Sequence, residues 1–374
     1  MANLPSIAEL RARFEAVTPF TVGIEEELML LDPGTLELTA VAPALLERLS
    51  GDARFKLELP ASHLEIALGP FAGADELAPA LREARGILSQ AASGLALPAA
   101  AGAHPFSPPV GTLNSGARYA AMIARYEPVA VRQLVCALQV HVAVGGADRT
   151  LAVYNGLRSY LPLLAALAAN APFYEGADTG LASVRPKLCE LLPRQGVPPV
   201  IESWEQHLEN LEWGARADTM ADAGMWWWEL RPHLEFGTLE IRVPDSQSSV
   251  ADVAAVAAVA HALAVWLAER HEAGELLSVA PTWRIEENRW SACHHGPAGS
   301  MADLESGELQ TTRAVLELLF EALEPTVVRL QAMDGLRHAA DLAAEGGAAA
   351  QRAAAGTGGA RAATRWLADR FLAE

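Results

Sequence analysis

Thr21-Val22-Gly23-Ile24-Glu25-Glu26-Glu27-Leu28-Met29-Leu30-Leu31 places three carboxylates in a row inside an apolar stretch typical of a β-strand. Side chains of a strand alternate between faces, so Glu25 and Glu27 share one face and Glu26 points to the other. Two carboxylates on one face repel each other, and water, basic side chains or bound cations must offset the repulsion. An exposed edge strand with hydrated charges also fits, so the triplet alone identifies no site.

Composition narrows the classes of function. The chain has 374 residues, a mass of 39.7 kDa and 51% hydrophobic residues, enough for one large domain or two to three smaller ones. A net charge of -18 disfavours nucleic-acid binding, although carboxylate-held Mg²⁺ can still bring in a nucleotide. The three cysteines lie far apart without zinc-type spacing, which fits a reducing compartment. We therefore expect a cytoplasmic protein.

Membrane insertion is not expected. The N-terminus carries early acidic residues and no apolar core typical of a signal peptide. The longest apolar run, Val253 to Ala268, is rich in Ala, is interrupted by His261 and is short for a membrane span. Ser249 followed by Asp252 indicates a helix start just before it. We predict a buried core helix.

Several segments repeat one two-faced strand pattern. Each has an aliphatic face and a face with Glu, His, Gln or Arg, which an antiparallel sheet with one covered and one open face explains. Helices are expected between these strands and throughout the last third, with interrupted helix or partly flexible chain after Ala339. The predicted fold is therefore α+β. The two-faced segments are Arg54–Leu59, His63–Leu68, Leu134–Val144 and Phe236–Val243.

The polar positions of these strands are mostly acidic. Carboxylates facing one another destabilise a fold without counter-charge, and hard divalent cations such as Mg²⁺ supply it, with phosphates completing the shell. Arg185, Arg231 and Arg242 would then bind phosphate or a substrate carboxylate. A merely solvated face remains the alternative. The carboxylates that could line one concave surface are Glu25, Glu27, Glu58, Glu65 and Glu240.

Seven stretches, taken in order, also match a known family. Together they resemble the bacterial type 2 glutamate–cysteine ligases, also called carboxylate–amine ligases, over roughly residues 20 to 300. The stretches are Gly23–Glu27, Gly102–Phe106, Gln139–Val142, Glu175–Arg185, Trp227–Pro232, Gly237–Arg242 and Glu287–Trp290.

The resemblance implies a glutamine-synthetase-like fold, a curved antiparallel sheet flanked by helices with ATP and Mg²⁺ in its concavity. It implies a single catalytic domain over 1–374, with a helical C-terminal part over 301–374. The implied reaction transfers the γ-phosphate of ATP to the γ-carboxylate of glutamate. The cysteine amine then displaces phosphate and yields γ-glutamylcysteine. Amino acids and ATP would be the partners, in a possible homodimer.

The resemblance also assigns roles to residues. Gln139 and His141 would lie near nucleotide or substrate. Arg185, Arg231 and Arg242 would hold phosphate or the amino-acid carboxylate and stabilise the transferring group, with Arg242 also contacting the cofactor. The implied metal ligands are Glu25, Glu27, Glu58, Glu65 and Glu240.

Two departures from the family pattern concern the substrate. The family often has His-Val-His-Val-Gly where this chain has Gln139 to Ala143, and Gln carries no charge. An Arg usually follows the stretch that ends at Trp290, but here Cys293-His294-His295 stands, which we interpret as loop residues. A different amine or acid is therefore one alternative. A non-catalytic ATP-binding regulatory protein on the same scaffold is another.

Overall fold

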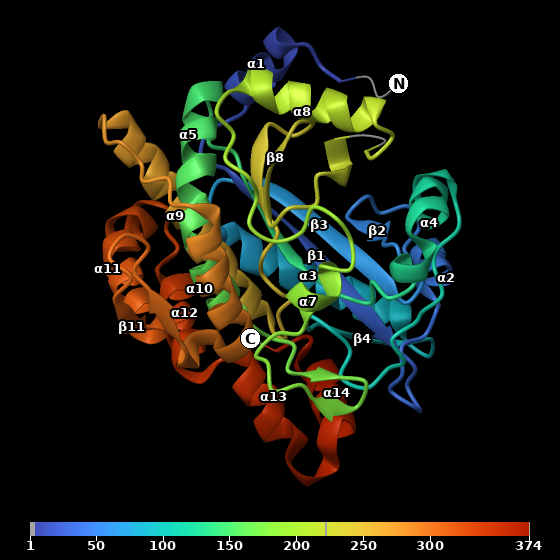
Figure 1. Cartoon of the computed structure of the whole chain (residues 1–374). Helices are drawn as coiled ribbons and strands as arrows, with labels where there is room; N and C mark the ends of the chain where they lie inside the picture. Colours follow the sequence, from blue (N-terminus) through green and yellow to red (C-terminus); the bar gives the residue numbers. More distant parts are fainter. Residues whose placement is uncertain (1–3, 221–222, 374) are drawn as a thin grey trace.

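The computed structural model describes residues 4–220 and 223–373, and an antiparallel sheet lies at its centre (Figure 1). In this described part the sheet has seven strands, ordered β2-β3-β1-β5-β9-β8, with β4 paired to β1 beside that path. The predicted α+β class with an antiparallel sheet is confirmed. The strands are β2 (Phe55–Leu57), β3 (His63–Phe71), β1 (Val22–Leu31), β5 (Leu138–Val142), β9 (Thr238–Ile241), β8 (Leu230–His233) and β4 (Leu97–Ala99).

One face of the sheet is apolar and covered by helices. Side chains such as Ile24, Leu64, Val140 and Ile241 are buried in one large cluster. The helices α3 (Ala74–Ala92), α5 (Ala147–Leu157) and α9 (Val250–Glu272) pack on this face, and α3 passes behind the sheet in Figure 1. The alternation read from the sequence therefore leaves the acidic positions on the face that these helices do not cover.

Further helices surround this core. The helices α11 (Thr312–Arg329) and α12 (Met333–Glu345) pack on α9, whereas α13 (Gly347–Ala355) and α14 (Gly359–Arg370) lie together at the lower end of Figure 1. Two small hairpins, β6–β7 (Phe173–Tyr174 and Ala177–Asp178) and β10–β11 (Ser300–Ala302 and Leu309–Thr311), complete the strands. The remaining helices are α1 (Ile7–Ala16), α2 (Ala42–Arg48), α4 (Ala117–Ala130), α6 (Leu161–Leu167), α7 (Arg185–Cys189), α8 (Trp204–Arg216) and α10 (Thr282–His295).

The apolar helix α9 lies in the core, as predicted. Its length and composition would suffice to cross a membrane, but 89% of its most apolar 18-residue window is buried inside the protein. Ser249 caps its first turn: the Ser249 hydroxyl accepts from the Asp252 N–H, and the Asp252 carboxylate accepts from the Ser249 N–H. The helix start that the sequence indicated is therefore confirmed.

Two predicted elements differ from the structure, and a third is confirmed. The sequence predicts one helix from about Leu151 to Asn170, but the structure has two helices there, α5 and α6, separated by a 3₁₀ turn. The prediction that His294 and His295 are loop residues is wrong, because both lie in the last turn of α10, which ends at Gly296 with φ +56°. After Ala339, helices α12, α13 and α14 are separated at glycines, so interrupted helix is confirmed there.

Glu26, the carboxylate on the apolar side of β1, is paired in the core. Its side chain and that of Arg85 on α3 are both 0% exposed and form a salt bridge. Arg85 also donates hydrogen bonds to the backbone carbonyls of Phe371 and Gln247, at 2.7 and 2.9 Å. The guanidinium of Arg85 therefore joins β1, α3 and the C-terminal segment. This contact lies on the side of β1 opposite Glu25 and Glu27.

The packing of α12 on α9 includes a pH-sensitive contact. His338 Nε2 lies 2.8 Å from Asp252 Oδ1, and this hydrogen bond raises the pKa of His338 above its usual 6.5. Burial alone would raise the pKa of Asp252, but the hydrogen bonds with His338 and Ser249 outweigh burial, and the pKa of Asp252 is lowered. Because the pKa of His338 is raised in the folded state, protonated His338 stabilises the fold at pH values below its unfolded-state pKa. This stabilisation is lost as the pH rises through the folded-state pKa.

We predict that His338→Gln lowers the free energy of unfolding more at about pH 5.5 than at about pH 9. Urea unfolding of both proteins at both pH values measures the difference. Equal losses at the two pH values would contradict a charged His338–Asp252 contact.

Candidate active site

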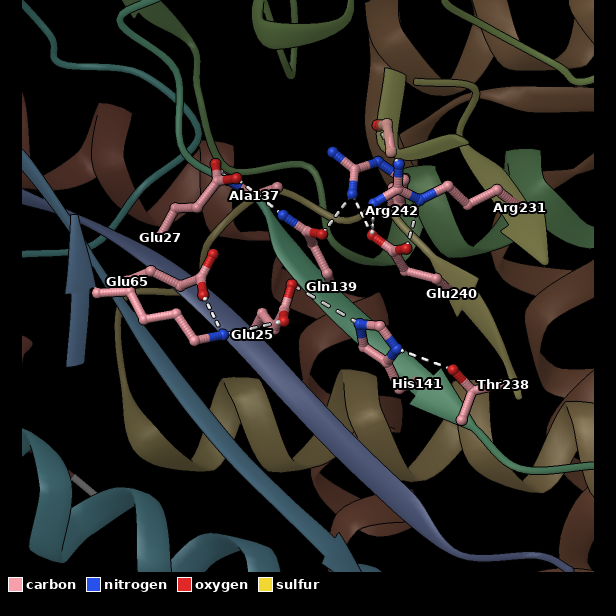
Figure 2. Close-up of polar contacts among 12 residues, drawn as sticks. Glu25, Glu27, Glu65, Ala137, Gln139, His141, Arg231, Thr238, Glu240 and Arg242 are labelled. Carbon is pink, nitrogen blue, oxygen red and sulfur yellow. Dashed lines mark hydrogen bonds and ion pairs between the residues drawn. The ribbon is translucent and has the colours of Figure 1, made fainter. Parts of the chain in front are cut away.

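Polar side chains of neighbouring strands lie opposite one another on the face not covered by α3, α5 and α9. Residues in register across the strands include Glu27 with Glu65, and His141 with Glu240. The result is a continuous band across the sheet, which Figure 2 shows in part. In strand order the band consists of Lys56, Glu65, Glu27, Glu25, Gln139, His141, Glu240, Arg242 and Arg231.

Glu25, His141 and Glu240 form a group that could hold a metal ion. One potential ligand atom from each lies within 4.8 Å of the other two. His141 Nδ1 is hydrogen-bonded to Thr238 Oγ1 at 3.0 Å, which orients the ring (Figure 2). Its Nε2 is buried without a hydrogen-bond partner and lies 3.7 Å from a Glu25 oxygen. Two carboxylates and a fixed imidazole with a free nitrogen suit a divalent cation such as Mg²⁺ or Mn²⁺.

The charge state of Glu25 fits this role. Burial alone would raise its pKa, but the neighbouring His141 and Lys56 lower the pKa of Glu25 to about 2. The carboxylate is therefore ionised at neutral pH and available as a ligand. The sequence predicted His141 near nucleotide or substrate, and the structure adds that its Nε2 completes the group with two of the predicted metal ligands.

Glu240 is the most enclosed carboxylate of the band. It is 0% exposed, accepts from Arg231 Nε at 2.5 Å and from Arg231 Nη2 at 3.1 Å, and is also paired with Arg242 (Figure 2). Burial would raise its pKa, but Arg242, Arg231 and His141 lower it well below the usual range. Two of the predicted catalytic arginines are thus brought together on one predicted metal ligand.

Gln139 joins the two halves of the band. Its amide donates to Glu27 Oε1 at 2.8 Å and its carbonyl oxygen accepts from Arg242 at 2.5 Å. The backbone N–H of Ala137 donates to the second Glu27 oxygen at 2.7 Å. Burial still raises the pKa of Glu27, with Arg185 acting against it. At this departure from the family pattern, a neutral side chain serves as donor and acceptor at once.

Glu65 and Glu58 lie toward the β2 edge. Glu65 is 5% exposed and lies 3.1 Å from the ammonium of Lys56, which also lies 3.5 Å from Glu25. Glu58 follows the end of β2 and accepts a hydrogen bond from the Leu59 N–H at 3.3 Å. The structure therefore brings Glu65 into the band, whereas the metal role of Glu58 stays a prediction.

Arg185 supports the site from the start of α7. It donates to the backbone carbonyls of Val243 at 3.0 Å and Arg242 at 2.9 Å, and lies 3.5 Å from Asp245. These contacts hold the backbone at Arg242 and Val243, directly after β9. A direct catalytic role of Arg185 stays a prediction.

Glu229 and Arg289 were not singled out by the sequence, although both lie in stretches that match the family. Arg289 Nε donates to Glu229 Oε1 at 2.7 Å, and both side chains are buried. The backbone carbonyl of Glu229 accepts a hydrogen bond from the Arg242 N–H at 2.8 Å, so Glu229 also holds the backbone directly after β9. Because the partners are 60 residues apart, no local pattern indicated their contact.

A cavity of about 340 Å³ borders the band at the β8 edge. Arg231 and His233 line it from the sheet, and Arg13 and Gly224 from neighbouring segments. His233 stacks on the half-exposed ring of Phe236, with centroids 4.2 Å apart. The volume lies within the range of small-molecule sites.

Relatives of known name match most of the chain. The chain is 37% identical over 327 residues to a protein of Rubrobacter xylanophilus provisionally named glutamate–cysteine ligase 2-3, covering 86% of this chain and 88% of that protein. It is 31% identical over 350 residues to a Mycolicibacterium smegmatis protein provisionally named glutamate–cysteine ligase 2-1, covering 93% of this chain and 92% of that one.

Solved structures share the fold at low identity. A glutamate–cysteine ligase of Francisella tularensis, in complex with AMP, superposes with a TM-score of 0.69 at 12% identity, covering 95% of this chain and 89% of that chain. A bifunctional glutathione synthetase of Pasteurella multocida gives a TM-score of 0.70 at 14% identity, covering 98% of this chain and 53% of that one. The sequence profile of glutamate–cysteine ligase family 2 matches residues 21–365. This chain therefore belongs to glutamate–cysteine ligase family 2.

Proposed function

We propose that the protein is an ATP-dependent carboxylate–amine ligase that joins the γ-carboxylate of glutamate to the amine of cysteine. The observation that carries the proposal is the group formed by Glu25, His141 and Glu240 with two arginines on Glu240. Phosphoryl transfer requires a divalent cation and fixed positive charges near the transferring group, and this arrangement provides places for both. Membership of the family supports the reaction type.

In this proposal the carboxylates hold Mg²⁺ and the arginines hold phosphate. Glu25, His141 and Glu240 bind one ion, with Glu27, Glu58 and Glu65 as candidates for a second. An ion held there would neutralise phosphate charge. Arg231 and Arg242 hold the γ-phosphate and, later, the leaving phosphate. Glu27, Glu58 and Glu65 are candidates because their carboxylates belong to β1 and β3 or directly follow β2 in the same sheet.

The bond changes balance without a further reactant. A γ-carboxylate oxygen attacks the γ-phosphorus of ATP, and the bond to the bridging oxygen of ADP breaks. The amine attacks the carbonyl carbon of the acyl phosphate, loses a proton to solvent or a nearby base, and releases inorganic phosphate. The protein's part is to place the two reactants and to offset negative charge.

Two alternatives share the scaffold. A different amine or acid keeps the same phosphate chemistry, and the departures at Gln139 and His294 motivate it. A non-catalytic ATP-binding protein would bind Mg-ATP without turning it over. Burying Glu240 between two arginines costs solvation, which favours a catalytic use of the group. Small-molecule substrates remain the proposed partners, and the net charge of -18 disfavours nucleic acid.

We predict that His141→Asn weakens Mn²⁺ binding about tenfold or more, because one ligand of the group is lost. Electron paramagnetic resonance of free Mn²⁺ measures the affinity, and ADP release measures turnover with glutamate and a panel of amines including cysteine. Turnover that needs cysteine and falls in His141→Asn supports the proposal. Turnover with another amine would keep the reaction type but identify that amine, not cysteine, as the substrate. Tight Mg-ATP binding without turnover would favour the non-catalytic alternative.

His207→Asn is the matched control. His207 is also buried, but it packs against Trp204 and Trp226 in a separate cluster. Its replacement is expected to leave Mn²⁺ affinity unchanged. Equal Mn²⁺ affinity in wild type and His141→Asn would contradict the metal role of His141.

A further inference from the structure

Lys56 stands between two predicted metal ligands from different strands. Its ammonium lies 3.1 Å from Glu65 Oε1 and 3.5 Å from Glu25 Oε1. The second oxygen of Glu25 faces His141 at 3.7 Å, so this carboxylate lies between the imidazole and the ammonium. Lys56 therefore contacts the same carboxylate that contributes to the candidate metal group.

The choice of Lys at this position is unusual for this chain. The sequence has two lysines, Lys56 and Lys187, among 28 basic residues, and the two ion pairs of Glu240 use Arg. A guanidinium is a planar fork, whereas an ammonium is a compact, strongly hydrated point charge. In size and charge distribution, Lys56 thus resembles a small bound cation more closely than an arginine would.

The band distributes its counter-charge unevenly. Glu240 has two arginines, and Glu27 has the Ala137 N–H and the Gln139 amide. On the side of Glu65, the ammonium of Lys56 supplies positive charge. A divalent ion on that side would have to take over carboxylate oxygens that the ammonium now contacts.

We propose that Lys56 is a built-in counter-cation that competes with a divalent ion for Glu25 and Glu65. This inference rests on the proposed function insofar as these carboxylates are metal ligands. Two cations cannot share the same oxygens without strong repulsion, so the ammonium leaves when an ion binds there. The Lys56 side chain is 39% exposed, and its flexible stem allows that movement. One ion binds at His141, Glu240 and the Glu25 oxygen that faces His141, and leaves Lys56 in place. A second ion binds more weakly, because it must displace the ammonium from Glu65 and from the other Glu25 oxygen.

The test counts Mn²⁺ bound to the whole, nucleotide-free protein by electron paramagnetic resonance. Lys56→Met leaves two carboxylates without their cation, so a second Mn²⁺ should bind about tenfold or more tightly than in wild type. Lys56→Arg keeps the charge and should bind the second ion at least as weakly as wild type. Lys187→Met removes the other lysine, which pairs with Glu190, and should leave both ions unaffected.

The opposite result has a distinct meaning. If Lys56 only positioned the carboxylates, its loss would weaken Mn²⁺ binding. Unchanged or weaker binding of the second Mn²⁺ in Lys56→Met would therefore overturn the proposal. Adding Glu65→Gln to Lys56→Met should abolish the gained affinity, which locates the second ion. Persistence of the gain in that double variant would also overturn it.

Selective acylation of amines gives a second readout that needs no turnover. Peptide mass spectrometry compares the modification of Lys56 with that of Lys187 in the same molecule. Saturating Mn²⁺ should increase the modification of Lys56 relative to Lys187, because the ammonium is displaced. No increase contradicts displacement, whatever the ligase activity is. Loss of ligase activity with intact displacement would instead count against the proposed function alone.

Discussion

Replacing Glu240 by Gln is expected to lower ATP-dependent ligation by at least about a hundredfold, a loss typical of removing one fixed charge from a reacting centre. The carboxylate is fully buried, belongs to the candidate metal group and holds both Arg231 and Arg242. Gln keeps the shape of the side chain but removes its charge. The divalent cation should then bind more weakly, and Arg231 and Arg242 lose their ionic partner. ADP release with glutamate and cysteine measures the effect.

Structural damage must be separated from lost chemistry. Removing one partner of a buried ion pair destabilises a protein, so urea unfolding of Glu240→Gln should accompany the assay. Glu240→Asp keeps the charge and should recover part of the Mn²⁺ affinity. Glu83→Gln, in an exposed pair with Arg54, serves as the control and should stay fully active. Wild-type turnover in a folded Glu240→Gln variant would exclude this carboxylate from the reaction.

Replacing Arg85 by Met is expected to cost about 3–5 kcal/mol of unfolding free energy, because Glu26 then keeps an unpaired charge in the core. Both side chains of the pair are fully buried, and Arg85 also holds the carbonyls of Phe371 and Gln247. The loss should therefore affect β1, α3 and the C-terminal segment together. Urea unfolding followed by circular dichroism measures it.

A double variant distinguishes the unpaired charge from lost packing. Glu26→Leu combined with Arg85→Met removes both charges and should recover much of the loss, because apolar replacements of a buried pair are often well tolerated. Arg337→Met removes the exposed pair with Asp334 and should change stability little. An Arg85→Met protein as stable as wild type would contradict the role of the pair.

Periodicity predicted the sheet because each strand buries one face. The alternation of Glu25 and Glu27 against Ile24 and Leu28 is reproduced by the burial of β1, and Glu26 on the opposite face is paired with Arg85. Local patterns of this kind depend on geometry within one strand. They are therefore visible without knowing which strands are neighbours.

Contacts between distant segments could not be read in the same way. Gln139 joins Glu27 to Arg242, which is 103 residues further along the chain, and Arg289 meets Glu229 from 60 residues away. The position of Lys56 between two carboxylates depends on the register of β2, β3 and β1. His294 and His295 were misplaced because the polar sequence of α10 resembles a loop, whereas its buried residues Ile285, Ala292 and Cys293 hold it as a helix.

The measurement that tests the proposed ligase most directly follows an oxygen atom from substrate to product. Glutamate labelled with ¹⁸O in its γ-carboxylate is incubated with the protein, Mg-ATP and cysteine, and the released phosphate is analysed by mass spectrometry. Activation of the carboxylate by phosphoryl transfer predicts one ¹⁸O in each phosphate, together with an equal amount of γ-glutamylcysteine. Phosphate released without ¹⁸O would show that water attacks ATP, and would contradict the proposed ligase reaction.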